Sequence, residues 1–326
     1  MNTTTSRRSA ASRAEALAIT PSRRRILELL HRYRYLTPRL LALAYSNGGD
    51  RASSHVRHEL ATLTKHNLVA RHYDSKRPRG QGSDQFIYTL SGSGGRAVLE
   101  RDDYSQSRHQ IYHRSQRAQG NYDHHLALSE LQLILELGAD GWTIESFRAD
   151  ERAPQSRFTA HLPGGVKHTN QPDAWVTFRL PSGQRPLYLF EVERERKNNR
   201  RTAQRLAAYA AYLTSPDARK MLEREGATYV AAVFIAANES EVERHMEYAA
   251  AALNAWPRRE RPQFFFWNRE DWYEQRAMER REAVGTPSQR TRQWTVNALR
   301  SPQAILRDPQ LCDIHGKPRW LVPTRG

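Results

Sequence analysis

The sequence contains a single cysteine, Cys312, among its 326 residues. One thiol excludes an intramolecular disulfide and a zinc site built from several cysteines. No apolar run approaches the ~18 residues that a membrane-spanning helix needs. The N-terminal segment MNTTTSRRSAASRAEA also lacks the apolar core of an export signal. We therefore expect a cytoplasmic protein with no membrane partner.

Acidic residues are scarce in the first third of the chain. Residues 1–119 hold 21 lysines and arginines against 9 aspartates and glutamates, a net charge of +12. Residues 120–326 hold 30 against 26, a net charge of +4. A basic module followed by a nearly neutral one is the charge pattern of a nucleic-acid-binding protein. The expected partner is double-stranded DNA.

Residues 21–100 predict an α+β domain of the winged helix-turn-helix type. Helical apolar spacing begins after Pro21, and Thr37-Pro38 starts a second helix, because threonine before proline is a helix-start signal. The expected third helix and the two strands of a hairpin are residues 51–66, 68–73 and 85–90. In such a domain the third helix enters the major groove and the hairpin tip contacts phosphates.

The candidate DNA contacts follow from the apolar face of the third helix. Val56, Leu60 and Leu63 lie at helical spacing and are expected to face inward. The polar residues of that helix and the basic tip of the hairpin are then available to DNA: Arg51, Ser53, Ser54, His55, Arg57, His58, Lys76, Arg77 and Arg79. Many winged helices bind protein instead, but that alternative leaves the charge of +12 unexplained.

The remaining segments complete the expected domain organisation. Residues 1–20 are predicted to be a disordered basic arm, residues 101–120 a linker or solvated helix, residues 121–270 a second domain, and residues 271–326 a C-terminal extension with a terminal hairpin. Within the second domain, residues 122–137 predict an apolar helix that carries Glu130, and residues 151–170 predict a polar loop. The apolar run 227–236 is typical of a central strand. Alternating helices and strands indicate an α/β domain with a mixed sheet.

Residues 171–194 predict a hairpin with acidic residues at one end. Two strands, 174–180 and 187–193, are separated by turn-forming residues. Because side chains alternate along a strand, Glu191 and Glu193 point to one face, and Asp173 opens the neighbouring strand beside them. Clustered carboxylates repel one another, and Mg²⁺ commonly relieves such repulsion. The alternative is that these acids are solvated, as acids near strand ends usually are.

These acids resemble the core of the PD-(D/E)xK nucleases, a superfamily with a restriction-endonuclease-like fold. The resemblance rests on the helix with Glu130, on Pro172-Asp173 and on Glu191-Val192-Glu193. It implies that Asp173 and Glu191 ligate Mg²⁺, with Mn²⁺ as a substitute. Glu193 occupies the position at which the superfamily usually has a lysine that orients or activates the attacking water. Arg205 on the next helix would then supply the missing positive charge, which completes a candidate catalytic set with Glu130.

A longer stretch, residues 23–267, resembles the replication-relaxation family of plasmids and other mobile elements. The similar segments are HHLALSELQLILEL, PDAWVTF, FEVERE and RLAAYAAY. In the last of these, residues 205–209 match the family's Lys-Leu-x-x-Tyr-like element. The resemblance implies a link to plasmid DNA replication and topology. A second copy of the chain, or replication and transfer proteins, would then be partners.

Three functions are compatible with these features. The first is a DNA-binding protein of plasmid or mobile-element replication or transfer, with a nuclease-like domain that binds Mg²⁺. The second is an active metal-dependent DNA endonuclease or nickase, and the third is a transcriptional regulator with an inert nuclease-like scaffold. The missing lysine favours binding, and the three retained acids favour catalysis. The sequence does not decide whether the protein is an enzyme.

Overall fold

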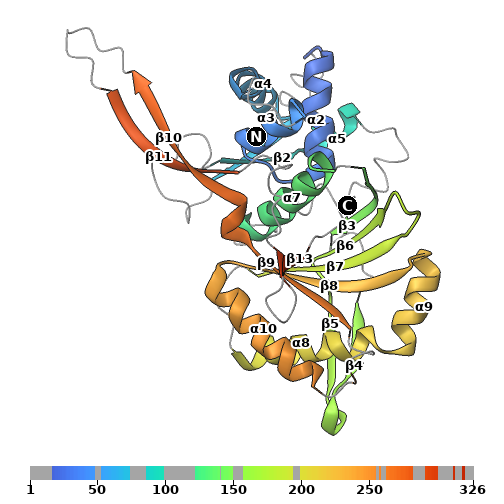
Figure 1. Ribbon diagram of the computed structural model, residues 1–326. Coiled ribbons are helices and arrows are strands. Elements are labelled where there is room, and N and C mark those ends of the chain that lie inside the picture. The colour runs from blue at the N-terminus through green and yellow to red at the C-terminus, as the bar shows by residue number, and fades with distance from the viewer. Residues whose placement is uncertain are drawn as a thin grey trace, which may run out of the picture. The chain divides into compact units, whose positions relative to one another are not determined.

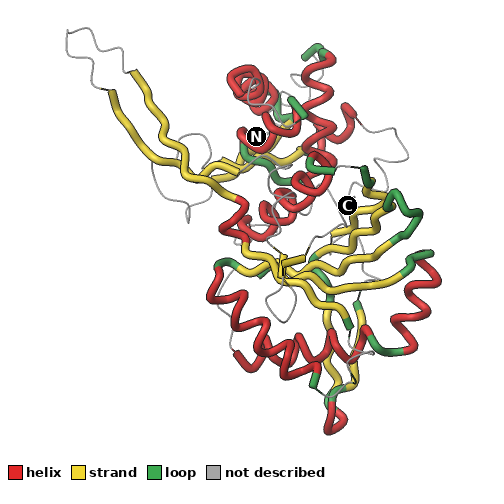
Figure 2. The backbone as a smooth tube through the Cα atoms, viewed as in Figure 1, coloured by secondary structure: helices red, strands yellow, loops and turns green. Residues whose placement is uncertain are grey.

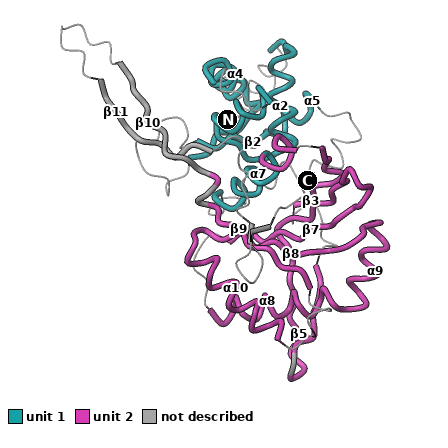
Figure 3. The backbone as a smooth tube through the Cα atoms, viewed as in Figure 1, with its two compact units in different colours: residues 1–133 teal, residues 134–326 magenta. Residues whose placement is uncertain are grey.

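The computed structural model describes residues 17–47, 53–73, 86–98, 122–139, 141–149, 157–193, 199–254, 257, 262–281, 291–299, 311–312 and 318–319. The chain divides into two compact units, residues 1–133 and 134–326 (Figure 3). The boundary falls within the helix α7, Tyr122–Leu137. The predicted linker 101–120 and most of the predicted basic arm lie outside the described residues.

Unit 1 contains three helices followed by a two-stranded antiparallel sheet and a short helix. Their bounds are α2 Pro21–Tyr33, α3 Pro38–Tyr45, α4 Ser53–Lys65, β1 Val69–Tyr73, β2 Phe86–Leu90 and α5 Gly92–Val98. The predicted order of three helices followed by two strands is confirmed. The helix start at Thr37 is confirmed too, because its hydroxyl accepts a hydrogen bond from the Leu40 N–H at 3.3 Å. The three helices share a core of fully buried aliphatic side chains: Ile26, Leu27, Leu41, Val56 and Leu63.

Unit 2 is built on a seven-stranded mixed sheet in the order β13-β12-β9-β8-β7-β6-β3 (Figure 1). The strands are β3 Thr143–Ala149, β6 Ala174–Arg179, β7 Pro186–Val192, β8 Tyr229–Ala236, β9 Gln263–Asn268, β12 Leu311–Cys312 and β13 Pro318–Arg319. The central strands β7, β8 and β9 are parallel, and the outer pairs are antiparallel. The predicted mixed sheet, the central strand and the terminal hairpin are confirmed.

Two helices pack against one face of this sheet. They are α8, Asn199–Leu213, and α10, Glu239–Leu253, and they lie side by side (Figure 1). Their apolar residues join those of the strands in one hydrophobic cluster, which includes Leu187, Leu189, Leu206, Tyr209, Phe234, Val242 and Phe266. Glu191 follows Leu187 and Leu189 at alternate positions of β7, so strand geometry directs it towards the same helices.

The prediction of a polar loop over residues 151–170 is wrong. The described part of this segment holds β4 Phe158–His161, the 3-10 turn Pro163–Gly165, and β5 Lys167–Asn170, with β4 and β5 paired in antiparallel fashion. Phe158 and Ala160 are buried in the hydrophobic cluster, while Thr159 is exposed. Buried and exposed side chains alternate along β4 as in a strand, but over only four residues. Packing against α8 stabilises this short strand.

Other elements extend the predicted set. The helix α9, Pro216–Glu225, begins at the N-cap Ser215, whose hydroxyl accepts a hydrogen bond from the Ala218 N–H. Beyond β9, the 3-10 turn Arg269–Trp272 leads into a long antiparallel pair, β10 Tyr273–Arg281 and β11 Thr291–Leu299 (Figure 2). None of the helices in the described part of the chain combines the length and the apolar character that a membrane span requires.

Candidate functional site

The acidic residues of the hairpin meet at one end of the strands β6 and β7. In the antiparallel register Ala174 pairs with Phe190, so Asp173 and Glu191 are the next residues along and stand opposite each other. The backbone N–H of Val192 donates a hydrogen bond of 2.8 Å to Oδ2 of Asp173. The structure therefore brings Asp173 to the end of β7, where Glu191 and Glu193 lie.

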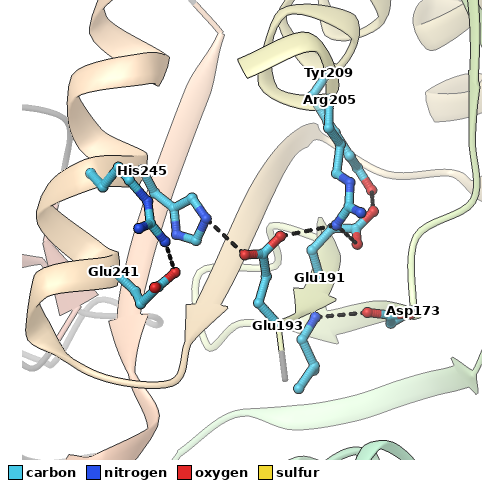
Figure 4. Close-up of polar contacts among 9 residues, drawn as sticks. Asp173, Glu191, Glu193, Arg205, Tyr209, Glu241 and His245 are labelled. Carbon is cyan, nitrogen blue, oxygen red and sulfur yellow. Dashed lines mark hydrogen bonds and ion pairs between the residues drawn. The ribbon is translucent and has the colours of Figure 1, made fainter. Parts of the chain in front are cut away.

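Arg205 connects the two glutamates (Figure 4). Its Nη1 donates to Oε2 of Glu191 and to Oε1 of Glu193, in both cases at 3.1 Å. Glu191 and Glu193 are 4% and 3% exposed. A single nitrogen reaches both carboxylates because the two side chains point to the same face of β7, which was the prediction from strand alternation.

Tyr209 lies one helical turn after Arg205 on α8 and binds the same acid. Its hydroxyl donates a 2.6 Å hydrogen bond to Oε1 of Glu191, and its side chain is completely buried. Burial and the neighbouring Glu191 carboxylate raise the pKa of Tyr209 well above its usual value. The phenol therefore remains a neutral hydrogen-bond donor at any physiological pH.

Arg205 remains a cation although it is largely buried. Burial acts to lower its pKa, but the charges of Glu191 and Glu193 outweigh burial and raise the pKa of the guanidinium above its usual value. Arg205 thus supplies positive charge to the buried carboxylates of Glu191 and Glu193, which require it. Arg205 therefore holds the two glutamates together.

The carboxylates assigned to Mg²⁺ by the nuclease resemblance are engaged by the protein itself. Glu191 accepts hydrogen bonds on both oxygens, from Arg205 and Tyr209, and Asp173 accepts one from the backbone. A Mg²⁺ site at Asp173 and Glu191 stays a prediction.

Glu130 is buried on α7, 4% exposed, as an acid within an apolar stripe. It belongs to unit 1, whereas Asp173, Glu191 and Glu193 belong to unit 2. The prediction that Glu130 approaches these acids therefore stays a prediction.

Two further residues complete the polar cluster, and the sequence analysis did not single them out. Oε2 of Glu193 lies 2.8 Å from Nε2 of His245 on α10 (Figure 4). Glu241 lies one turn before His245 and is bound by the guanidinium of Arg244. The only sequence signal was an acid and a histidine four residues apart after a buried strand, a pattern that many surface helices share.

The third helix of unit 1, α4, has one buried side and one exposed side, as the sequence predicts. Val56, Leu60 and Leu63 are buried, at 0%, 1% and 0% exposure. The opposite side presents four exposed candidate DNA contacts: Ser54, His55, Arg57 and His58. Ser53 is half-buried, and His55 contacts Ser22 on α2 through a 2.6 Å hydrogen bond. Arg51, Lys76, Arg77 and Arg79 lie outside the described residues.

The middle of α4 is joined to α2 by an ion pair. Nε of Arg23 donates a 2.8 Å hydrogen bond to Oε2 of Glu59, and both side chains are largely buried. This ion pair joins α2 to the inward side of α4.

The fold and the candidate site define an α+β protein with a mixed sheet and a buried acid pair bound by an arginine. A family model described as replication-relaxation matches residues 27–223. The match covers more than half of the chain, and the chain therefore belongs to the replication-relaxation family. The matched range includes α4, the acids on β7, and both Arg205 and Tyr209. Searches of curated proteins and of solved structures found no match.

Proposed function

We propose that this chain is a DNA-binding protein that acts in the replication or transfer of a plasmid or other mobile element. In this proposal unit 1 is a winged helix-turn-helix that selects a site on double-stranded DNA. Unit 2 is a restriction-endonuclease-like domain that serves as a scaffold. Membership of the replication-relaxation family supports the link to replication.

One observation carries the DNA-binding part of the proposal: the two-sided character of α4. Its apolar side is buried in unit 1, while its opposite side exposes Arg57 together with hydroxyl and imidazole groups. Side chains of these types hydrogen-bond to base edges and phosphates. The helices α2, α3 and α4 and the antiparallel pair β1–β2 follow one another in the order of a winged helix. The net charge of +12 over residues 1–119 supports an anionic partner.

Substitution of Arg57 tests this assignment. Arg57→Ala is expected to weaken binding of the full chain to a duplex selected from random sequence by about 1–3 kcal/mol, because arginine contacts base edges in the major groove. Binding to an unrelated duplex should weaken less. Fluorescence anisotropy at fixed salt measures both affinities. Arg219→Ala, which removes the same charge from an exposed position in unit 2, is the control and should leave both unchanged. Equal losses on the two duplexes would contradict base reading by Arg57.

The scaffold role of unit 2 is supported by the internal cation. Arg205 and Tyr209 hold Glu191, and Arg205 also holds Glu193, so side chains of the fold itself bind both acids. The alternative function is a Mg²⁺-dependent DNA nickase, which is favoured by the convergence of Asp173 with the two glutamates. In that alternative, Mg²⁺ would supply Lewis-acid chemistry at the phosphodiester.

Incubation with supercoiled plasmid separates the two functions. We expect the plasmid to remain supercoiled in the presence of Mg²⁺ or Mn²⁺, as judged by agarose electrophoresis. The scaffold assignment is wrong if relaxed plasmid accumulates with the divalent ion and Asp173→Ala prevents it. Because DNA binding is measured separately by anisotropy, nicking would revise the role of unit 2 and leave that of unit 1 unchanged.

A further inference from the structure

We propose that Glu193, Glu241 and His245 bind one divalent transition-metal ion of the class of Zn²⁺ and Mn²⁺. This site is distinct from the Asp173–Glu191 pair that resembles a Mg²⁺ site. It does not depend on DNA binding by unit 1 or on the role proposed for unit 2.

The fold brings these three residues together at the carboxyl ends of neighbouring parallel strands. Glu193 follows β7 directly, and its N–H donates a 2.9 Å hydrogen bond to the carbonyl of Ile235 on β8. The helix α10 begins just after β8, at the N-cap Asn238, whose side chain accepts a hydrogen bond from the Glu241 N–H. Ligand sites of sheets with parallel strands form at this edge, beyond the carboxyl ends of the strands.

The spacing on α10 directs both of its ligands to the same place. Glu241 and His245 are four residues apart, and residues with this spacing share one side of a helix. That side faces the sheet: His245 is completely buried, Glu241 is 8% exposed, and the ring of Phe234 lies 6.2 Å from the imidazole. The cluster therefore lies inside unit 2.

The distances between the donor atoms suit an ion of this class. One donor atom from each residue lies within 4.8 Å of the other two, and Nε2 of His245 is 2.8 Å from Oε2 of Glu193. A point centred among three such atoms is about 2.8 Å or less from each, and zinc bonds to nitrogen and oxygen measure about 2.0–2.2 Å. Side-chain movements of less than about 1 Å would complete the bonds.

The buried imidazole is the second, independent observation. His245 is 0% exposed, yet neither ring nitrogen makes a hydrogen bond within the described residues. Its Nε2 approaches Glu193 without the alignment of a hydrogen bond. A buried polar group without a hydrogen bond is costly. A metal ion bound at Nε2 would satisfy the buried imidazole.

The charges around the cluster also favour a cation. The other oxygen of Glu193, Oε1, accepts a hydrogen bond from Arg205, which also donates to Glu191. The carboxylate of Glu241 is paired with Arg244. The cluster thus offers carboxylate oxygens from Glu193 and Glu241 and a nitrogen ligand from the imidazole of His245. An imidazole with two carboxylates matches Zn²⁺ or Mn²⁺ better than Mg²⁺, which prefers oxygen ligands and retains several waters.

Zn²⁺ titration of the full chain tests the proposal. After treatment with a chelator and dialysis, the protein is expected to bind one Zn²⁺ per chain in isothermal titration calorimetry. Co²⁺ in its place should give a visible absorption band. Glu241→Gln should weaken Zn²⁺ binding by more than about tenfold, since removal of a ligand costs at least as much as removal of an outer-shell partner. Glu243→Gln, the same change at an exposed position of α10, should have no effect.

Two further variants locate the ion. His245→Asn is expected to abolish the Co²⁺ band, whereas Asp173→Asn should keep both the band and the Zn²⁺ affinity. Circular dichroism of the Glu241→Gln protein confirms that any loss of binding occurs in a folded chain. The proposal is overturned if no saturable site is found, in which case His245 and Glu193 form an ion pair only. It is also overturned if Asp173→Asn, and not Glu241→Gln, removes binding, because the ion then belongs to the acid pair on β6 and β7.

Discussion

Arg205→Met is expected to lower the free energy of unfolding of unit 2 by about 3–5 kcal/mol, because it leaves two buried carboxylates without their cation. Glu191 and Glu193 are 4% and 3% exposed and share the same guanidinium nitrogen. Methionine keeps much of the volume of the side chain, so the loss reports charge more than packing. Urea unfolding followed by tryptophan fluorescence measures the effect.

The matched control for this substitution is Arg201→Met on the same helix. Arg201 is exposed, and surface substitutions of this kind change stability by no more than about 0.5 kcal/mol. A second test adds Glu193→Gln to Arg205→Met. Because it removes one of the uncompensated charges, the double variant should be more stable than the sum of the single losses predicts. A stability loss in Arg205→Met no larger than in the control would mean that the acids do not need this cation.

Tyr209→Phe is expected to destabilise unit 2 by about 1.5–3 kcal/mol, the usual cost of removing a hydrogen bond to a charged group. The hydroxyl of Tyr209 donates at 2.6 Å to Glu191, and both side chains are buried. Phenylalanine preserves the ring packing against Phe158 and Phe234. The measured loss in urea unfolding therefore belongs to the hydroxyl.

Tyr212→Phe is the matched control, since Tyr212 lies on the same helix and stacks on Phe158. Within the described residues the Tyr212 hydroxyl makes no hydrogen bond. Burial raises the pKa of Tyr212 to about 12, so the hydroxyl is protonated as that of Tyr209 is. Its removal should change the free energy of unfolding by less than about 0.5 kcal/mol. Equal losses for the two variants would show that Tyr209 contributes only packing at this position.

Local sequence signals were sufficient for most of the secondary structure. The helix over residues 122–137 has the predicted bounds, because long apolar periodicity identifies helices well. The pair Thr37-Pro38 located a helix start for the same local reason. The short strands β4 and β5 escaped prediction, since four residues carry too little periodicity and their stability comes from contact with α8.

The spacing of residues in the sequence was enough to predict which side of β7 carries the acids and which side of α4 faces inward. Both results depend only on the period of a strand or helix, which every residue in the element shares. Strand alternation placed Glu191 and Glu193 together, and the shared contact with Arg205 agrees with it.

The partners of the acids depend instead on how the helices pack against the sheet. Arg205 and Tyr209 reach Glu191 because α8 packs across β7, and His245 reaches Glu193 because α10 starts at the end of the neighbouring parallel strand. Between 14 and 52 residues separate these partners in the chain. No local pattern records such a separation, since it depends on strand order and on the direction in which each helix returns over the sheet.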